Sequence, residues 1–240
     1  DNELICLLQR HGFKTNHISQ YQTFDAFQTM GSSVLNIVTA PLALYAAKQM
    51  KLRYGLEYLY LPVSYTFDEI EQGVKQVCEA LKLPVPDLSE ARHAAENKVK
   101  ETAKTLDSQP ICIDYAATYR TFGLARLLLE YGFQVDTLYV SECLPVDREH
   151  MRWIKENHQE VAILQPERFS MVGKEQDKRD ALCIGFEAAY YTGSPHVVPL
   201  AADGEHYGFA GMISLMEKMR WESKRSYDLE QLVKDSGLVV

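Results

Sequence analysis

A loop in the second half of the chain combines Thr118, Tyr119 and Arg120, which are suited to binding an anion. Arginine supplies a fixed positive charge and a planar set of hydrogen-bond donors. The loop follows a short apolar segment and precedes a helical pattern, and helix N-termini attract anions. Two alternatives stay open for Arg120: it binds an anionic cofactor with Thr118 and Tyr119, or it pairs with a surface carboxylate.

A second loop, residues 201–209 with the sequence AADGEHYGF, is the most distinctive string in the chain. Gly204 and Gly208 permit tight backbone turns. His206 and Tyr207 add a titratable group and a hydrogen-bond donor, so this loop is also a candidate cofactor-binding segment. The alternative for His206 is a hydrogen-bonding turn residue without a catalytic role.

Two further loops carry weaker candidates. Cys143 lies beside Glu142, and its thiolate is a candidate metal ligand, whereas a lone cysteine is commonly a small buried apolar residue. Residues 165–177 include Arg168 and Lys174, and this polar segment is interpreted either as a wrap around a ligand or partner subunit, or as a solvated loop.

Several common catalytic and nucleotide-binding signatures are absent from the sequence. It has no GxGxxG fingerprint, no phosphate-binding GxxxxGK[ST] loop, no GxSxG elbow and no HExxH pair. The sequence therefore lacks the residues of the usual nucleotide-binding, hydrolase and zinc-protease classes.

The four loops follow or join segments with alternating strand and helix character. Short apolar strands are predicted at residues 110–115, 134–140, 160–164, 180–186 and 196–200. Helices are predicted between and after them, at residues 123–133, 147–157, 187–191 and 208–219. Strands that alternate with helices through short loops indicate a parallel sheet covered on both faces, with ligands bound beyond the carboxyl ends of the strands.

The first half of the chain has the same character. Strands are predicted at residues 34–38 and 56–63, an extended segment taken as a further strand at 14–18, and helices at 3–13, 41–54, 66–83 and 89–106. Thr66 and Glu69 have the spacing of a capping box at the start of the third helix. The prolines at 84 and 86 end that pattern, and the polar helix 89–106 suits a connector between two sheets.

A repeat links the two halves. Residues 3–13, ELICLLQRHGF, and residues 123–133, GLARLLLEYGF, share five identities and both end in Gly-Phe. A glycine just past the last turn is typical of a helix C-terminus. The second copy is preceded by a strand and the first is not, so we expect residues before Asp1 and interpret the chain as a fragment.

These observations predict an α/β fold with two doubly wound, Rossmann-like parallel-sheet domains joined by a connector helix. The expected boundaries are a first domain at 1–84, a connector at 85–109, a second domain at 110–222 and a polar tail at 223–240.

Composition narrows the functional classes. The net charge of -8 and the absence of a basic cluster argue against nucleic acid as a partner. Five cysteines without a CxxC pair suggest a reducing compartment, and no apolar run reaches the length of a membrane span. We therefore expect a cytoplasmic protein without a membrane partner.

Longer strings point to a family. Residues 180–219, DALCIGFEAAYYTGSPHVVPLAADGEHYGFAGMISLMEKM, closely resemble the last domain of nitrogenase component 1 subunits and of their relatives in cofactor assembly and tetrapyrrole reduction. Residues 36–62, which include AAKQMKLRYGLEYLYLP, resemble the middle domain of the same family. With the connector helix, the resemblance covers nearly the whole chain.

The resemblance implies an oxidoreductase subunit that is missing its N-terminal domain. Complete family members have three such domains, and the first supplies cysteines to an iron-sulfur cluster. An ATP-dependent iron-sulfur reductase component delivers electrons to clusters held by paired, homologous component 1 subunits. An iron-sulfur cluster or related metallocofactor is thus expected in the full-length complex, with no cofactor and no activity in this fragment alone.

The family's cofactor ligands are not matched here. The resemblance places the ligand cysteine of catalytic subunits at Thr39 or Ala40 and the ligand histidine near Val198, and none of these residues binds iron. The arginine that stands beside the cofactor falls on Arg120, which is kept. This pattern predicts a non-canonical member of the family.

Two other hypotheses remain. One is a scaffold or binding module that holds a metallocofactor or a small anionic ligand between domains without redox turnover. The other is a solute-binding protein of similar build, which would need a signal peptide in the full gene.

Overall fold

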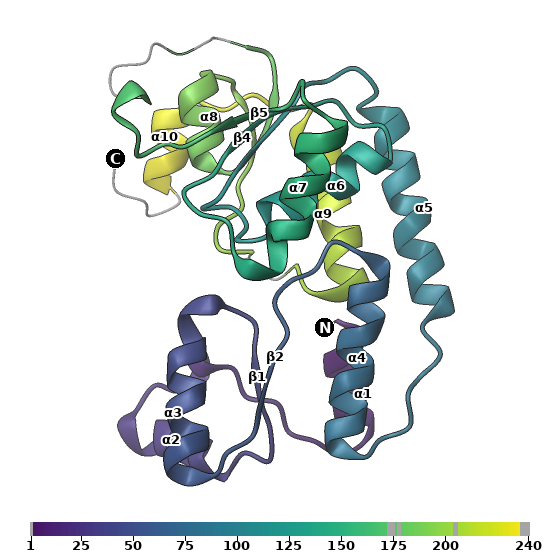
Figure 1. Cartoon of the computed structure of the whole chain (residues 1–240), viewed down its shortest axis with the longest axis vertical. Helices are drawn as coiled ribbons and strands as arrows, with labels where there is room; N and C mark the ends of the chain where they lie inside the picture. Colours follow the sequence, from purple (N-terminus) through teal and green to yellow (C-terminus); the bar gives the residue numbers. More distant parts are fainter. Residues whose placement is uncertain (1, 172–175, 177–178, 204–205, 236–240) are drawn as a thin grey trace. The chain divides into compact units, whose positions relative to one another are not determined.

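The computed structural model describes residues 2–171, 176, 179–203 and 206–235, which form two compact units that divide between Glu90 and Ala91 (Figure 1). Each unit contains a parallel sheet flanked by helices, which confirms the predicted α/β class. The division falls inside the expected connector at 85–109.

The first unit contains a two-stranded parallel sheet, β1 (Asn36–Val38) and β2 (Tyr58–Tyr60). The crossover between them consists of η3 (Pro41–Ala43) and α3 (Leu44–Tyr54), and α3 packs against both strands. Gly55 ends α3 with a positive φ of 70°, a conformation that glycine adopts without a Cβ penalty. The other elements of this unit are α1 (Glu3–Arg10), η1 (Ile18–Gln20), α2 (Phe24–Gln28), η2 (Thr29–Ser32) and α4 (Phe67–Leu81).

Helices α1 and α4 share a small apolar core. Leu7 from α1 packs with Val74 and Cys78 from α4, and Leu83 and Leu88 complete the cluster. The apolar stripe of α4 that carries Val74 and Cys78 is therefore its buried face.

Two local predictions for the first unit are wrong. Thr66 is the N-cap of α4 but makes no capping hydrogen bond, because the hydroxyl of Ser64 accepts the Thr66 N–H at 3.2 Å and donates to the carboxylate of Glu69. A nearby serine thus replaces the capping box. Residues 14–18 form no strand: His17 has extended dihedral angles, but the segment runs into η1 without pairing.

The repeat identified in the sequence is a repeated helix ending. In α1, the N–H groups of Gly12 and Phe13 donate to the carbonyls of Gln9 and Leu8, both at 3.0 Å. In α6 (Thr121–Glu130), the N–H groups of Gly132 and Phe133 make the equivalent bonds to Leu129 and Leu128, also at 3.0 Å. Both glycines have positive φ, 78° and 83°, so each copy is a Schellman cap in which glycine avoids a Cβ penalty.

The second unit is built on a five-stranded parallel sheet with the order β5-β4-β3-β6-β7. The chain moves outward from β3 to β4 and β5, and then returns to place β6 on the other side of β3. This reversal defines a doubly wound sheet with its switch point between β3 and β6. The strands are β3 (Ile111–Asp114), β4 (Val135–Tyr139), β5 (Ala162–Leu164), β6 (Leu182–Ile184) and β7 (His196–Val198).

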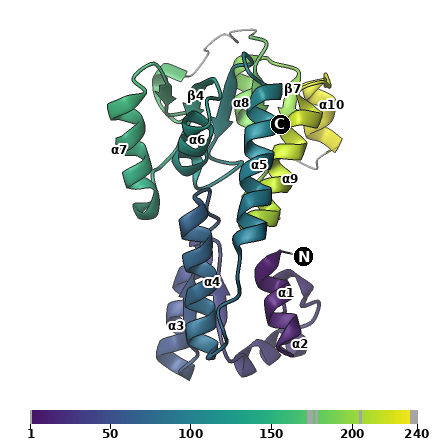
Figure 2. The same ribbon diagram turned by 90° about the vertical axis from the view of Figure 1, so that its right-hand side faces the viewer.

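Helices cover both faces of this sheet. Figure 1 shows α6 and α7 (Arg148–Asn157) on one face and α8 (Phe186–Thr192) and α10 (Leu229–Asp235) on the other. Figure 2 shows α5 (Ser89–Thr105) beside α9 (Gly208–Glu222), where Lys98 Nζ lies 3.0 Å from Glu217 Oε1. Two short helices, η4 (Pro145–Asp147) and η5 (Phe169–Met171), follow β4 and β5. None of the described helices is both long and apolar enough to cross a bilayer.

The expected polar tail at 223–240 contains an ordered helix. Tyr227, Leu229 and Leu232 pack against the core that surrounds β3, β6 and α8. Leu229 and Leu232 are three residues apart, so both side chains lie on one face of α10, where they are partly buried against the unit. The described part of this segment therefore packs as part of the second unit.

The switch point places Asp114, the last residue of β3, directly against Gly185, which follows β6. Gly185 has φ 106°, and a Cβ added there would lie 2.1 Å from Asp114 Oδ2. Only glycine combines this backbone conformation with so close an approach.

We expect Gly185→Ala to lower the free energy of unfolding by roughly 2–6 kcal/mol, since strained dihedrals and overpacking each cost about 1–3 kcal/mol. The matched control is Gly132→Ala, where φ is also positive but nothing lies within 4 Å of an added Cβ. That control should cost only about 1–2 kcal/mol. Chemical unfolding followed by circular dichroism measures both, and equal losses would contradict the close approach at Gly185.

Candidate functional site

The loops after β3 and β7, singled out in the sequence, lie together in the second unit. The N–H of Ala202 donates to the carbonyl of Ala116 at 2.7 Å, and the N–H of Asp203 donates to that of Ala117 at 2.8 Å. Thr118 Oγ1 donates to the carboxylate of Asp203, and both side chains are buried. The two candidate loops therefore form one hydrogen-bonded layer at the carboxyl edge of the sheet.

This layer includes two residues in an uncommon backbone conformation. Ala202 and Asp203 have φ of 49° and 65°, which L-residues other than glycine seldom adopt. Their hydrogen bonds to the loop after β3 hold them there. Sequence reasoning missed Asp203, although aspartate tolerates the left-handed region better than most residues.

Arg120 is buried, with 3% of its side chain exposed, and is held by residues of the loop after β4 and of α7. Its Nε lies 2.9 Å from Asp147 Oδ1, and its Nη2 lies 3.2 Å from His150 Nε2. Asp147 also accepts the N–H groups of Phe122 at 2.9 Å and Gly123 at 3.1 Å, at the start of α6. Arg120 therefore pairs with a carboxylate, as one alternative proposed, but in the interior rather than at the surface.

Asp147 acts as the N-terminal cap of α6 from a distant part of the chain. Burial raises the pKa of this carboxyl, and the adjacent Arg120 charge opposes that shift. Neither Asp147 nor His150 was selected from the sequence. The sequence offered one clue to this pairing. Asp147 follows β4 and Arg120 follows β3, and the two strands are neighbours in the sheet.

His206 is 3% exposed and binds its own turn. Its Nδ1 lies 3.2 Å from the carbonyl of Gly211, and its Nε2 lies 3.2 Å from Lys218 Nζ. A lysine ammonium only donates, so we assign the ring proton to Nδ1. A Cβ on Gly211 would lie 2.2 Å from the His206 carbonyl carbon, so this turn requires glycine.

The remaining predicted site residues lie around these contacts. Tyr207 is the half-buried N-cap of α9, and Gly208 begins that helix with φ 71°. Tyr119 is half-buried and packs edge-on against Tyr115, with ring centroids 5.3 Å apart. Gly204 lies outside the described residues.

Cys143 is half-buried, and its Sγ lies 3.6 Å from the carbonyl of Leu144. Burial, followed by the nearby Asp147 charge, raises the pKa of this thiol and disfavours the thiolate that a metal would need. Across the ranges described, no three His, Cys, Asp or Glu side chains are grouped to hold a metal ion.

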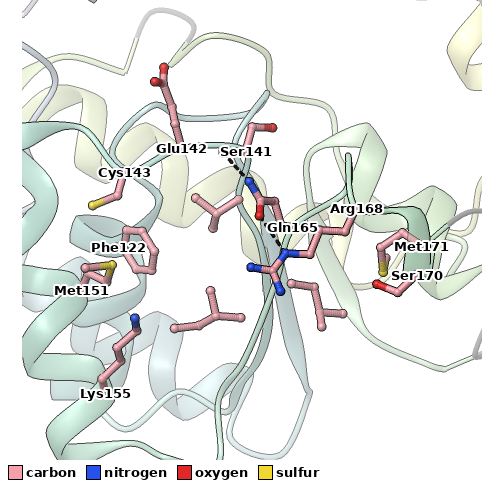
Figure 3. A pocket seen from close by; sticks show the side chains of 13 residues that line it. Phe122, Ser141, Glu142, Cys143, Met151, Lys155, Gln165, Arg168, Ser170 and Met171 are labelled. Carbon is pink, nitrogen blue, oxygen red and sulfur yellow. Dashed lines mark hydrogen bonds between the residues drawn. The ribbon is translucent and has the colours of Figure 1, made fainter.

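Cys143 lines a cavity of about 410 Å³ beyond the carboxyl ends of β4 and β5 (Figure 3). Arg168 lines the same cavity, so the structure brings together two of the candidate loops. Lys174, from the same predicted segment as Arg168, lies outside the described residues.

Asp114 occupies the switch point itself. Its Oδ1 accepts the N–H of Ala117 at 2.7 Å, and its Oδ2 accepts the N–H of Ala188 in the first turn of α8 at 2.9 Å. Burial raises its pKa to about 7, while these donors act in the opposite direction. In dinucleotide-binding proteins of similar topology, a phosphate binds a helix N-terminus at the switch point. Here a carboxylate of the chain already holds such a position, which agrees with the lack of a GxGxxG loop.

We expect Asp147→Asn to lower the free energy of unfolding by roughly 3–5 kcal/mol, because it leaves the Arg120 charge buried without a counter-charge. The control Glu130→Gln removes the partner of Arg126 in an α6 pair with N–O distance 2.8 Å and far greater exposure, and should cost less than about 1 kcal/mol. Adding Arg120→Met to Asp147→Asn should recover part of the loss. A double variant less stable than Asp147→Asn would contradict the buried-charge explanation.

Asp114 predicts a pH dependence of stability. Its pKa is raised from 3.8 to about 7 by folding, so between these values the folded chain keeps a proton that the unfolded chain releases. Stability should therefore fall as pH rises from about 4 to about 7, with no further loss from this group above that range. Carboxyl carbon NMR, assigned with Asp114→Asn, measures the titration directly, and a midpoint below 4 would refute the prediction.

Comparisons with known proteins identify one family and one similar fold. The family model for nitrogenase component 1 type oxidoreductases matches residues 2–221. A solved structure, "Nitrogenase Cp1 at pH 6.5", superimposes with a TM-score of 0.61 at 13% identity, and the match covers 99% of this chain and 59% of that one. A search of curated proteins finds no match. The chain therefore belongs to the nitrogenase component 1 type oxidoreductase family, and it spans less than two thirds of the nitrogenase chain it resembles.

Proposed function

We propose that this chain is the framework part of an oxidoreductase subunit that works in electron transfer through an iron-sulfur cluster or related metallocofactor. The observation that carries the proposal is the family match across residues 2–221, which includes both units. The doubly wound sheet supports it, because such sheets hold ligands beyond the carboxyl ends of their strands.

The proposed partners follow from the same family membership. A homologous component 1 subunit would pair with the intact protein, and an ATP-dependent iron-sulfur reductase component would supply electrons. The chain spans 59% of the similar nitrogenase chain. The proposal therefore also relies on residues of the intact protein that lie outside this chain.

The described residues of this chain do not fit the role of cluster ligands. Thr39 and Ala40, where the family resemblance places a ligand cysteine, follow β1 and carry no metal-binding atom suited to iron. Val198, where it places a histidine, ends β7 and is fully buried. We infer that the subunit is non-canonical and that any cluster ligands lie outside the part of the chain described here.

One observation favours the second hypothesis, a scaffold or binding module without redox turnover. The guanidinium of Arg120, kept from the pattern of catalytic subunits, is bonded to Asp147 inside the unit. An arginine used in this way stabilises the fold, whereas a catalytic role would need it to face a bound group. Substrate reduction by the intact complex separates the two hypotheses.

The test is anaerobic purification of the intact protein, followed by measurement of iron and sulfide per chain and of its mass in solution. We expect bound iron and association with a sister subunit. Cys143→Ser should leave the iron content unchanged, because a single protonated thiol is a poor ligand. A metal-free protein without a partner would overturn the redox proposal. If the unaltered protein binds iron and Cys143→Ser does not, Cys143 is a ligand.

A further inference from the structure

The cavity beyond β4 and β5 has an apolar interior. Phe122, Val140, Ile163 and Leu164 come from the sheet and the start of α6, and Met151 and Met171 lie on opposite sides in Figure 3. Its volume of about 410 Å³ falls within the range of about 300–1,000 Å³ that is usual for small-molecule sites.

Two cationic side chains reach this cavity from separate elements, Lys155 from α7 and Arg168 from the segment after β5. In the part of the chain that the structure describes, neither pairs with a carboxylate. Figure 3 shows the guanidinium of Arg168 extended into the middle of the cavity, with Lys155 on the far side. The charges of these two side chains are therefore available to a ligand.

Two consecutive hydrogen bonds hold Arg168 in this position. Its Nε donates to Gln165 Oε1 at 2.9 Å, and Gln165 Nε2 donates to the carbonyl of Ser141 at 3.3 Å (Figure 3). The bond to Gln165 uses only the Nε–H of the guanidinium, and the two terminal nitrogens are directed at the cavity. A guanidinium fixed in advance loses less entropy when it binds an anion.

The balance of charge in the lining is positive. Glu142 is the one carboxylate among the described lining residues, and it accepts a hydrogen bond from the Tyr115 hydroxyl at 2.6 Å. Together with Lys155 and Arg168, the described lining residues carry one net positive charge in a chain whose net charge is -8. Such a local excess attracts an anion.

We propose that this cavity binds a small organic anion with an apolar body. Its carboxylate or phosphate group would take two hydrogen bonds from Arg168 and an ion pair from Lys155, while its apolar part covers the Phe122 and methionine surface. The site lies wholly within the second unit and requires no metallocofactor, so it stands apart from the proposed redox function.

The probe is octanoate, compared with octanamide, acetate and inorganic phosphate, added to the intact protein. The seven methionines give separate methyl signals in a ¹³C-methionine NMR spectrum, and two of them line the cavity. We expect octanoate to shift the signals of Met151 and Met171 and to leave those of Met212, Met216 and Met219 in place. Octanamide and acetate should bind at least about tenfold more weakly than octanoate, since octanamide lacks the negative charge and acetate lacks the apolar chain.

Variants locate the charge requirement. Arg168→Gln and Lys155→Gln should each weaken octanoate binding by about fivefold to tenfold, in the range of one typical net hydrogen bond. Arg152→Gln is the matched control, because it removes the same charge from α7 at an exposed residue outside the cavity lining.

Three outcomes would overturn the proposal. Octanamide that binds as tightly as octanoate would indicate a merely apolar groove, and Arg152→Gln that weakens binding as much as the cavity variants would indicate general charge attraction. The third is a shift of the α9 methionine signals instead of those of Met151 and Met171. If inorganic phosphate competes with octanoate, the shared anion subsite is supported and phosphate esters join carboxylates as ligands.

Discussion

The carboxyl edge of the five-stranded sheet depends on one constraint: helix N-termini buried there must have their backbone N–H groups bonded. Two aspartates meet it for α6 and α8. Asp147 accepts the first N–H groups of α6 and neutralises Arg120, and Asp114 accepts an N–H of α8 while bridging to the loop after β3. These contacts position the loop after β3, the loop after β4 and the helix starts that follow β3 and β6.

The same constraint shapes what the unit can bind. In many doubly wound proteins the free N–H groups at this edge hold phosphate. Here internal carboxylates hold them, and the positive charge left for a ligand lies to one side, beyond β4 and β5, at Lys155 and Arg168. The chain thus keeps the architecture of its oxidoreductase family while its described residues offer no metal-ligand set.

Sequence patterns predicted what depends on neighbours along the chain. The alternation of strands and helices and the paired Schellman caps at Gly12 and Gly132 are local properties, and the structure confirms them. The pairing of Arg120 with Asp147 joins residues from different loops, and no local pattern encodes it. The capping box at Thr66 failed for a related reason, since Ser64 offered a competing hydroxyl that spacing rules do not weigh.

Strand order in the second unit also has a kinetic consequence. Central strand β3 pairs with β4 soon after it in the chain, but its other edge is completed only by β6, after β5 and a long intervening loop. Pairing between distant segments is slow because the loop must first close. During synthesis, one edge of the apolar strand β3 therefore stays unpaired until β6 emerges, and an unpaired strand edge can pair with another chain.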